Sequence, residues 1–221
     1  MIKIENVETY GWEATIRGMR NPMNSWDKSD SYWGLLEDES PVNPCDEPFF
    51  FVGDKDLDLM ERLSQAGNDH GKFLRMITVT LDITAPLYWW KEFDTYKVGT
   101  VANSCSTMHK IHAKPFELDD FSHENLSGEA ANVLACQIIP MLNKARNYFI
   151  EYKDKQFWWD MIQLLPSSYN QKRTVQLNYA VLKNMYHARV NHKLDCWRTF
   201  CDWMLTLPYF KEVCVDVVDH S

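Results

Sequence analysis

The sequence predicts an α/β (α+β) fold in which a mixed sheet is flanked by helices and accompanied by a helical segment. Apolar and polar residues alternate over 2–7, 77–84 and 174–178, which is typical of strands with one buried face. A helical pattern follows each of these segments along the chain. The 221 residues, 45% of them hydrophobic, suffice for one well-buried core. We therefore expect a single domain over residues 1–221 with no internal repeat.

The first elements are a short alternating strand and a helix over 12–19. The helix should end before Asn21-Pro22, because the residue before a proline disfavours the helical conformation. Residues 21–50 are rich in Asn, Pro, Asp and Ser and predict a long loop or flap. Loops of this length are usually functional or disordered, so this one is a candidate for a role at a site.

A second helix and a strand follow the loop. Asp54 can cap the helix, and Gly67 suits the left-handed position at its end. The strand over 77–84 then leads into a turn where Thr84 should cap a helix and Pro86 should stand early in it. We therefore expect residues 87–94 to be helical.

The rest of the chain is mainly helical. Residues 129–152 form a long helical pattern that Pro140 should kink or split in two. Before it, small polar residues over 103–107 predict a loop that faces substrate. The further elements expected are a helix over 154–164, a strand over 174–178, helices over 179–190 and 193–206, and a C-terminal extension over 207–221 that packs on the outside or frays.

Charge and composition exclude several classes of protein. A formal charge of −8 without a sustained basic run argues against a nucleic-acid binder. No apolar run approaches the roughly 20 residues that a bilayer span requires, so no membrane association is expected. The first residues are typical of a strand rather than an export signal, which predicts a cytoplasmic protein. The six cysteines lie far apart, which favours reduced thiols: Cys45, Cys105, Cys136, Cys196, Cys201 and Cys214.

Two blocks of residues resemble the flavin-dependent thymidylate synthase family, also called the thymidylate synthase complementing proteins. The first block has the order of the family's strand, Ala-Pro, Arg-Gln/Glu-Trp, Arg-His-Arg and small-residue loop: Ala85-Pro86, Lys91-Glu92-Phe93, Thr95-Tyr96-Lys97 and Val98-Gly99-Thr100. The second has the spacing of the family's Leu-Pro, strand, Asn-x-Arg-Ser-Leu, Asn and Leu-Arg: Leu165-Pro166, Tyr169, Asn178, Leu182, Asn184 and Arg189. The likeness covers residues 57–206, and two chance motif matches would not easily give it.

The resemblance implies a homotetrameric flavoprotein methyltransferase of nucleotide biosynthesis. Such an enzyme transfers one carbon reductively from methylenetetrahydrofolate to dUMP or a related pyrimidine nucleotide, with FAD as cofactor and NADPH as co-substrate. By position, the cofactor-binding residues are His70, Lys97, Asn178 and Asn184, and the substrate-binding residues are Glu92, Asn103, Cys105 and Arg189. The catalytic residues that the resemblance implies are His70 and Arg189, with no metal; Cys105 is a third catalytic candidate on separate grounds. An arginine suits a uracil edge, because its fork can bond and polarise the carbonyl oxygens.

The chain also departs from the family pattern. Thr95-Tyr96-Lys97 replaces Arg-His-Arg, and Thr107, Ile162 and Ala180 stand where the family has arginine. The ligands are anions, which arginines, lysines or helix N-termini usually bind. Two classes therefore stay open: an enzyme of this type, and a diverged non-catalytic or nucleotide-binding homologue that has lost flavin and phosphate contacts. The residues that favour the enzyme are His70, Asn178, Asn184 and Arg189.

Cys105 stands where the family has a serine and supports a second hypothesis. A thiolate there could attack the pyrimidine ring in place of a flavin-dependent step. The alternative is a small residue that substitutes for serine in a loop, and this is favoured because a reactive cysteine needs an electropositive setting.

Other groups have simpler interpretations. His109-x-x-His112 has the spacing of a metal pair without a third ligand nearby, and His192, Cys196 and Cys201 lack the Cys-x-x-Cys pairs of a zinc site. Surface histidines and core thiols are favoured. The pairs Trp89-Trp90 and Trp158-Trp159 could stack on a base or flavin, but core packing is the default for aromatic residues on a helix.

Overall fold

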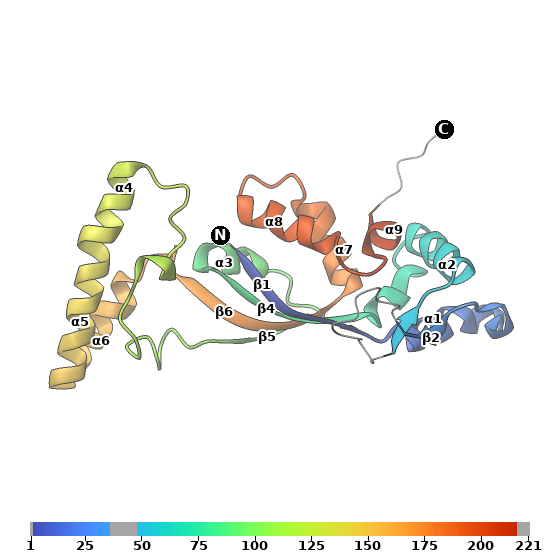
Figure 1. The fold of residues 1–221 in the computed structure, drawn as a ribbon, viewed down its shortest axis with the longest axis horizontal. Coiled ribbons are helices and arrows are strands. Elements are labelled where there is room, and N and C mark those ends of the chain that lie inside the picture. Colours follow the sequence, from blue (N-terminus) through green and yellow to red (C-terminus); the bar gives the residue numbers. More distant parts are fainter. Residues whose placement is uncertain (1, 36–47, 216–221) are drawn as a thin grey trace. The chain divides into compact units, whose positions relative to one another are not determined.

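The computed structural model describes residues 2–35 and 48–215, and it confirms the mixed fold of helices and strands (Figure 1). One sheet has four strands in the order β1-β4-β6-β5. Their bounds are Lys3–Tyr10 for β1, Thr78–Pro86 for β4, Val101–Ser104 for β5 and Asn170–Asn178 for β6. None of the helices in these described ranges is long and apolar enough to cross a bilayer.

Strand β4 has the alternation that the sequence predicts. Val79 and Ile83 are fully buried and Leu81 is 1% exposed, whereas Thr80 and Asp82 are only partly buried. Because successive strand residues point to opposite faces, the period of two in the sequence translates directly into one buried face.

The chain forms two compact units, and β1, β4 and β6 contribute residues to both. Unit one comprises Met1–Val7, Leu81–Lys97 and Val101–Val175, and unit two comprises Glu8–Thr80, Val98–Thr100 and Gln176–Ser221.

Unit one contains α3 (Leu87–Phe93), the short η4 (Leu118–Asp120) and a helical segment in which α5 and α6 lie side by side (Figure 1). The helical segment consists of α4 (Gly128–Val133), the π-helical η5 (Leu134–Ile138), α5 (Ile139–Tyr152) and α6 (Lys155–Leu164). Its core includes Leu134, Leu142 and Met161.

Pro140 divides the long helical pattern as predicted. It is the second residue of α5, directly after the π-helical turn η5. Proline has no N–H to donate and its ring crowds the preceding turn, so regular α-helical bonding cannot run through this position.

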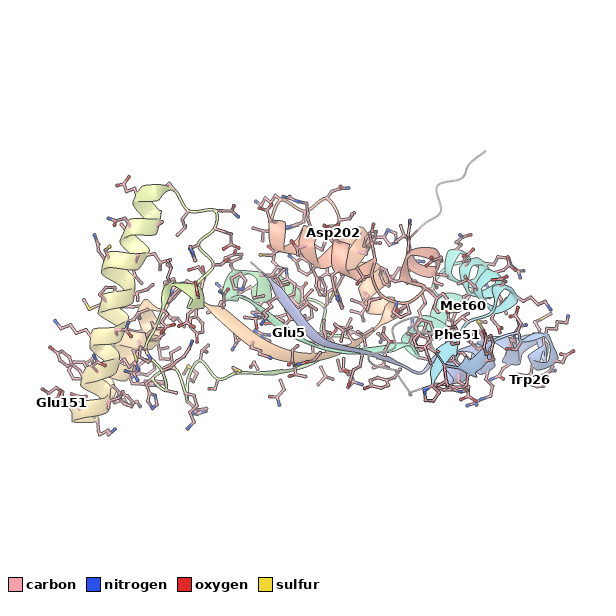
Figure 2. All side chains as sticks on the ribbon, in the orientation of Figure 1. Glu5, Trp26, Phe51, Met60, Glu151 and Asp202 are labelled. Atoms are coloured by element: carbon pink, nitrogen blue, oxygen red, sulfur yellow. The ribbon has the colours of Figure 1, made fainter. Side chains whose placement is uncertain are left out.

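Unit two contains five α-helices among its described residues, a two-stranded antiparallel sheet and three short 3-10 helices. The helices are α1 (Trp12–Arg20), α2 (Asp54–Gln65), α7 (Tyr179–Arg189), α8 (Asp195–Met204) and α9 (Phe210–Cys214). The short elements are η1 (Asn21–Met23), η2 (Trp26–Lys28), η3 (Gly71–Arg75), β2 (Tyr32–Gly34) and β3 (Phe49–Phe51). Figure 2 draws the side chains: Met60 of α2 is fully buried, whereas Trp26 is half exposed and Asp202 of α8 is exposed to solvent.

Several element boundaries differ from the sequence expectation. Gly53, not Asp54, stands at the N-cap of α2, and Asp54 is the first helical residue. Helix α3 begins at Leu87, as expected, but Thr84 belongs to β4 and does not cap it, and Pro86 is the last residue of β4 and the N-cap of α3. The backbone N–H of Leu87 donates to the carbonyl oxygen of Tyr169 at 3.0 Å. A long-range bond, not a local capping side chain, thus satisfies the first N–H of α3.

The two segments expected to be irregular contain regular structure. Within 21–50, Tyr32–Gly34 pairs with Phe49–Phe51, while residues 36–47 lie outside the described chain. In the C-terminal extension, Phe210 and Cys214 of α9 are fully buried, and residues 216–221 lie outside the description. The loop expected from residue 103 begins as β5, because an exposed strand gives no alternation for a sequence pattern to reveal.

Candidate functional site

A cleft of about 700 Å³ lies within unit two. Its walls come from the end of α2 and the turn after it, from η3, from the loop at residues 98–99 and from α7. The lining residues are Ser64, Gly67, Asn68, Gly71, Leu74, Arg75, Val98, Gly99, Asn178, Ala180, Val181, Lys183, Asn184 and His187. This volume is in the usual range of small-molecule sites.

Helix α7 presents one of its faces to the cleft. Ala180, Lys183, Asn184 and His187 recur with helical spacing and line the cleft. The opposite face is buried and consists of Tyr179, Leu182 and Met185. The apolar stripe anchors the helix, and the polar stripe therefore faces the open space.

Asn178 caps α7 and also lines the cleft. Its Oδ1 accepts the backbone N–H of Val181 at 3.1 Å, which satisfies one of the free donors at the helix start. Its Nδ2 lies against Gly99, where an added Cβ would come within 3.0 Å of that nitrogen. Gly99 also has φ of +81°, a conformation that favours glycine. The loop at residue 99 therefore packs tightly on the beginning of α7.

The cleft lining carries positive charge and no carboxylate. Among the described residues that line it there is no Asp or Glu, although the chain has 31 acidic residues. Lys183 and Arg75 supply the cations. The Nζ of Lys183 donates to the backbone oxygen and to the Oγ of Ser64, at 3.0 and 2.9 Å. The lining thus suits an anionic ligand better than a cationic one.

The predicted cofactor and catalytic residues of unit two are only partly brought together. Asn178 and Asn184 line the cleft. His70 is exposed on the turn that follows α2, where its N–H donates to Gly67 at 3.1 Å; it does not itself line the cleft, but the next residue, Gly71, does. Arg189 does not line the cleft, and its guanidinium lies 4.9 Å from the ring centroid of Trp197.

The remaining predicted residues belong to unit one. Glu92 is half-buried on α3, and Lys97 is exposed shortly after it. Asn103 and Cys105 are exposed at β5 and just beyond its end. The Cys105 N–H donates to the Lys172 carbonyl at 2.9 Å, so the backbone of this segment is held on β6 while the thiol faces solvent.

A partly buried network in unit one connects the end of α3 with the segment after β5. Gln171 is its centre: its Nε2 donates to the Cys105 oxygen at 2.8 Å, and its Oε1 accepts from Arg173 Nε at 3.0 Å. Arg173 Nη1 also donates to Asp94 at 2.7 Å, and its guanidinium lies 4.2 Å from the ring centroid of Trp90. The segments that carry Glu92, Lys97, Asn103 and Cys105 are therefore fixed by the same two side chains of β6.

The structure gives no support to a metal site. No group of three or more metal-ligating side chains occurs in the described part of the chain, which includes His109, His112 and His192. Cys196 and Cys201 are buried on α8, and burial raises the pKa of the Cys201 thiol to about 11. They are core thiols, the favoured interpretation.

One indole of each tryptophan pair donates a hydrogen bond to a backbone oxygen. Trp89 and Trp90 are both buried, and the Trp90 indole donates to the backbone oxygen of Gln171 at 3.0 Å. The Trp158 indole donates to the Met108 oxygen at 2.9 Å. Trp159 is the most exposed of the four, at 38%.

The residues that give the two sites their charge and rigidity were not predicted from the sequence. Lys183 shares the cleft face of α7 with Asn184, and the helical spacing from Ala180 to His187 is a signal that could have found it. Gln171 and Arg173 had no such signal, because their partners lie far away in the sequence.

Comparisons with known proteins identify the fold. No model of a known protein family and no curated protein sequence matches this chain. Solved structures do match it. A thymidylate synthase X (ThyX) from Helicobacter pylori, with FAD and dUMP, has a TM-score of 0.71 at 14% identity and covers 100% of both chains.

Two further structures agree with this match. A flavin-dependent ThyX from Helicobacter pylori complexed with FAD and dUMP has a TM-score of 0.68 at 15% identity, over 97% of this chain and 98% of the other. A UMP/dUMP methylase from Streptomyces cacaoi, bound with 5-Br dUMP, has a TM-score of 0.54 at 12% identity, over 84% of this chain and 76% of the other. The predicted resemblance is thus confirmed in three dimensions: this chain has the fold of the flavin-dependent thymidylate synthases.

Proposed function

We propose that this protein is an enzyme of the flavin-dependent thymidylate synthase type. It would transfer one carbon reductively from methylenetetrahydrofolate to dUMP or a related pyrimidine nucleotide with reduced FAD. The observation that carries the proposal is the cleft of unit two, which combines amide donors and cations with an absence of acidic residues in its described lining. The similar structures that contain FAD and dUMP support the same class of ligand.

The residues of the cleft fit an anionic dinucleotide such as FAD. Asn178 and Asn184 offer side-chain amides, which can donate to ring carbonyls and accept from ring N–H groups. His70 is the third proposed cofactor ligand and lies on the turn beside the cleft residue Gly71. Lys97, the fourth, is the cation that remains from the signature position. Bound FAD would supply the hydride after reduction by NADPH, and the folate would supply the carbon.

On the resemblance, we assign the binding of the pyrimidine nucleotide to four residues: Glu92, Asn103, Cys105 and Arg189. Arg189 has the chemistry to bond and polarise a uracil carbonyl through its planar fork. Its stacking on Trp197 restrains the guanidinium and reduces the entropy lost when a ligand binds. Gln171 bonds the backbone oxygen of Cys105, and Arg173 bonds the carboxylate of Asp94 after Glu92, which would help to keep the substrate-facing groups in position.

We extend the proposal to a cytoplasmic homotetramer, again on the resemblance. Sedimentation or light scattering of the purified protein measures the assembly directly. A monomer at micromolar concentration would contradict this part of the proposal and leave the ligand class untouched.

The test of the function is the visible absorbance of the purified protein, with and without added FAD. A flavoenzyme retains or takes up FAD and shows the flavin bands after removal of free cofactor. The nucleotide is tested by the melting temperature with dUMP, because a ligand at 100 times its dissociation constant adds about 2.7 kcal/mol to the free energy of unfolding.

The same experiment separates the second candidate, a nucleotide-binding homologue without flavin. This candidate is favoured by the position of Arg189, which does not line the cleft with Asn178 and Asn184. A colourless protein that fails to bind excess FAD but is stabilised by dUMP would establish it. A protein that responds to neither ligand would remove both candidates.

A further inference from the structure

Lys183 is held in the cleft by neutral groups alone. Its Nζ donates to the backbone oxygen of Ser64 at 3.0 Å and to the Ser64 hydroxyl oxygen at 2.9 Å. The Ser64 hydroxyl in turn donates to the Val213 carbonyl at 2.6 Å, so its oxygen is left to accept from the lysine. The ammonium is therefore oriented by two acceptors that carry no negative charge.

The charge and one N–H of Lys183 remain unused among the residues that the structure describes. An ammonium group has three donors, and two are engaged by Ser64. No described carboxylate forms an ion pair with Lys183, and none lines the cleft. A half-buried cation costs desolvation energy unless an anion compensates it, so this arrangement favours an anionic ligand at Nζ.

Arg75 strengthens the same bias. It is an exposed residue of η3 and lines this cleft. The segment η3 itself contains no acidic residue that could pair with the guanidinium. Lysine acts on a phosphate as a compact point charge, and arginine adds a fork that matches two phosphate oxygens. The pair thus suits a group with several acidic oxygens.

We propose that Lys183, together with Arg75, binds a phosphate group of the ligand in this cleft. The inference rests on the proposed function and adds to it two residues that hold the ligand's phosphate. The ligand chemistry is a phosphate monoester or a pyrophosphate, and its source is either the dinucleotide cofactor or the pyrimidine nucleotide. Ser64 is a positioning residue, since it acts by orienting the ammonium.

The alternative role for Lys183 is structural, because its bonds to Ser64 join α7 to α2. Lys183→Gln tests the difference: the amide can still donate to Ser64, but the charge is gone. Lys183→Arg restores the charge in a different shape. Lys193→Gln is the matched control, because Lys193 is exposed and lies outside the cleft lining.

The first probe is inorganic pyrophosphate, whose binding at this site does not require a flavin. At constant ionic strength it should raise the melting temperature of the wild-type protein and of Lys193→Gln. The rise should be lost in Lys183→Gln and at least partly restored in Lys183→Arg. No rise in the wild type, or an equal rise in Lys183→Gln, would overturn the inference.

The second set of probes identifies the source of the phosphate. Lys183→Gln should weaken either FAD or dUMP by roughly tenfold to a hundredfold, the loss of one charge-assisted hydrogen bond. Riboflavin and deoxyuridine lack phosphate, so their affinities should not change. If Lys183→Gln loses affinity for FAD alone, the phosphate belongs to the dinucleotide cofactor. If it loses affinity for dUMP alone, the phosphate belongs to the pyrimidine nucleotide.

The inference and the proposed function fail in different ways. If FAD and dUMP bind equally well to the wild type and to Lys183→Gln, the role of Lys183 is wrong and the function stands. If FAD does not bind but pyrophosphate stabilises the protein through Lys183, the phosphate site stands and the flavoenzyme is wrong.

Discussion

The side chain of Gln171 joins Cys105 to Arg173. Its amide nitrogen donates to the Cys105 carbonyl oxygen at 2.8 Å, and its amide oxygen accepts from Arg173 Nε at 3.0 Å. Gln171 is 7% exposed, so water cannot readily replace either bond. Both ends of this buried amide are satisfied, as a stable interior requires.

We expect Gln171→Leu to lower the free energy of unfolding by about 1–3 kcal/mol, because it leaves a carbonyl and a guanidinium N–H without their partner. Urea denaturation measures the loss. Gln176→Leu is the control, since Gln176 is exposed on the same strand and should change stability by less than about 0.5 kcal/mol. Equal effects of the two substitutions would show that the network is not stabilising.

A buried ion pair stabilises unit two. Arg20 Nε lies 2.6 Å from Asp56, and the two side chains are 5% and 0% exposed. Asp56→Asn should cost about 3–5 kcal/mol, because the arginine charge stays buried without its counter-charge. Asp58→Asn breaks an exposed pair with Arg62 and should cost less than about 1 kcal/mol. Comparable losses for both variants in thermal unfolding would contradict this.

The ionisation of Asp56 should also make the stability of the protein depend on pH in acid. Burial raises its pKa, but hydrogen bonds from Ser29, Ser31 and Arg20 outweigh burial and hold the pKa below its usual 3.8. Because the folded value is lower than the unfolded one, this stabilisation is present above pH 3.8 and is lost as the pH falls through the folded pKa. Asp56→Asn should therefore show a flatter decline of stability with acid than the wild type.

A side chain at Gly99 should destabilise the protein more than a side chain at Gly67. In Gly99→Ala the new Cβ would approach Asn178 Nδ2 at 3.0 Å and Val181 at 3.1 Å, in addition to the strain of a positive φ. Gly67→Ala has a positive φ but no atom within 4 Å of the added carbon. We expect Gly67→Ala to cost about 1 kcal/mol and Gly99→Ala clearly more. Only Gly99→Ala should also weaken ligand binding in the cleft, as measured by the shift in melting temperature.

The cysteines should differ sharply in reactivity. Cys105 and Cys136 are exposed, whereas burial raises the pKa of Cys201 to about 11 and that of Cys214 to about 12. Alkylation of the native protein at pH 8, mapped by peptide mass spectrometry, should modify the first two and spare the others until the chain unfolds. Rapid labelling of Cys214 in the native state would contradict its place in the core.

The buried thiols also affect stability in alkali. Their folded pKa values exceed the usual value of 9, so the neutral thiols stabilise the fold fully below pH 9, and this contribution is lost as the pH rises through 11 to 12. Denaturation midpoints should fall over this range.

Cys105→Ser tests the thiolate hypothesis. The backbone of Cys105 is held by Lys172 and Gln171 whatever the side chain, so the variant should fold with unchanged stability. Under the proposed function it should retain turnover, because flavin-dependent chemistry needs no protein nucleophile and serine stands at this position in the family that the sequence resembles. Abolished turnover in a variant that still binds the nucleotide would instead make Cys105 the nucleophile.

The elements whose patterns are local could be predicted from the amino-acid sequence. The period of two over 77–84 identified β4, and Pro140 identified the interruption before α5, because burial on one face and the missing N–H of proline are properties of neighbouring residues. The family resemblance, carried by the sequence, also implied Asn178 and Asn184 as site residues, and both line the cleft.

The contacts between side chains that are distant in the sequence could be found only in the folded chain. Lys183 bonds Ser64, which is 119 residues away in the sequence, and Gln171 bonds Cys105, which is 66 residues away. The first N–H of α3 donates to the distant carbonyl oxygen of Tyr169. No local pattern carries such pairs, since hydrogen bonding between distant residues depends on how the elements pack. The same packing leaves the charge of Lys183 facing a cleft whose described lining has no carboxylate, and this charge distinguishes an anion site from an ordinary groove.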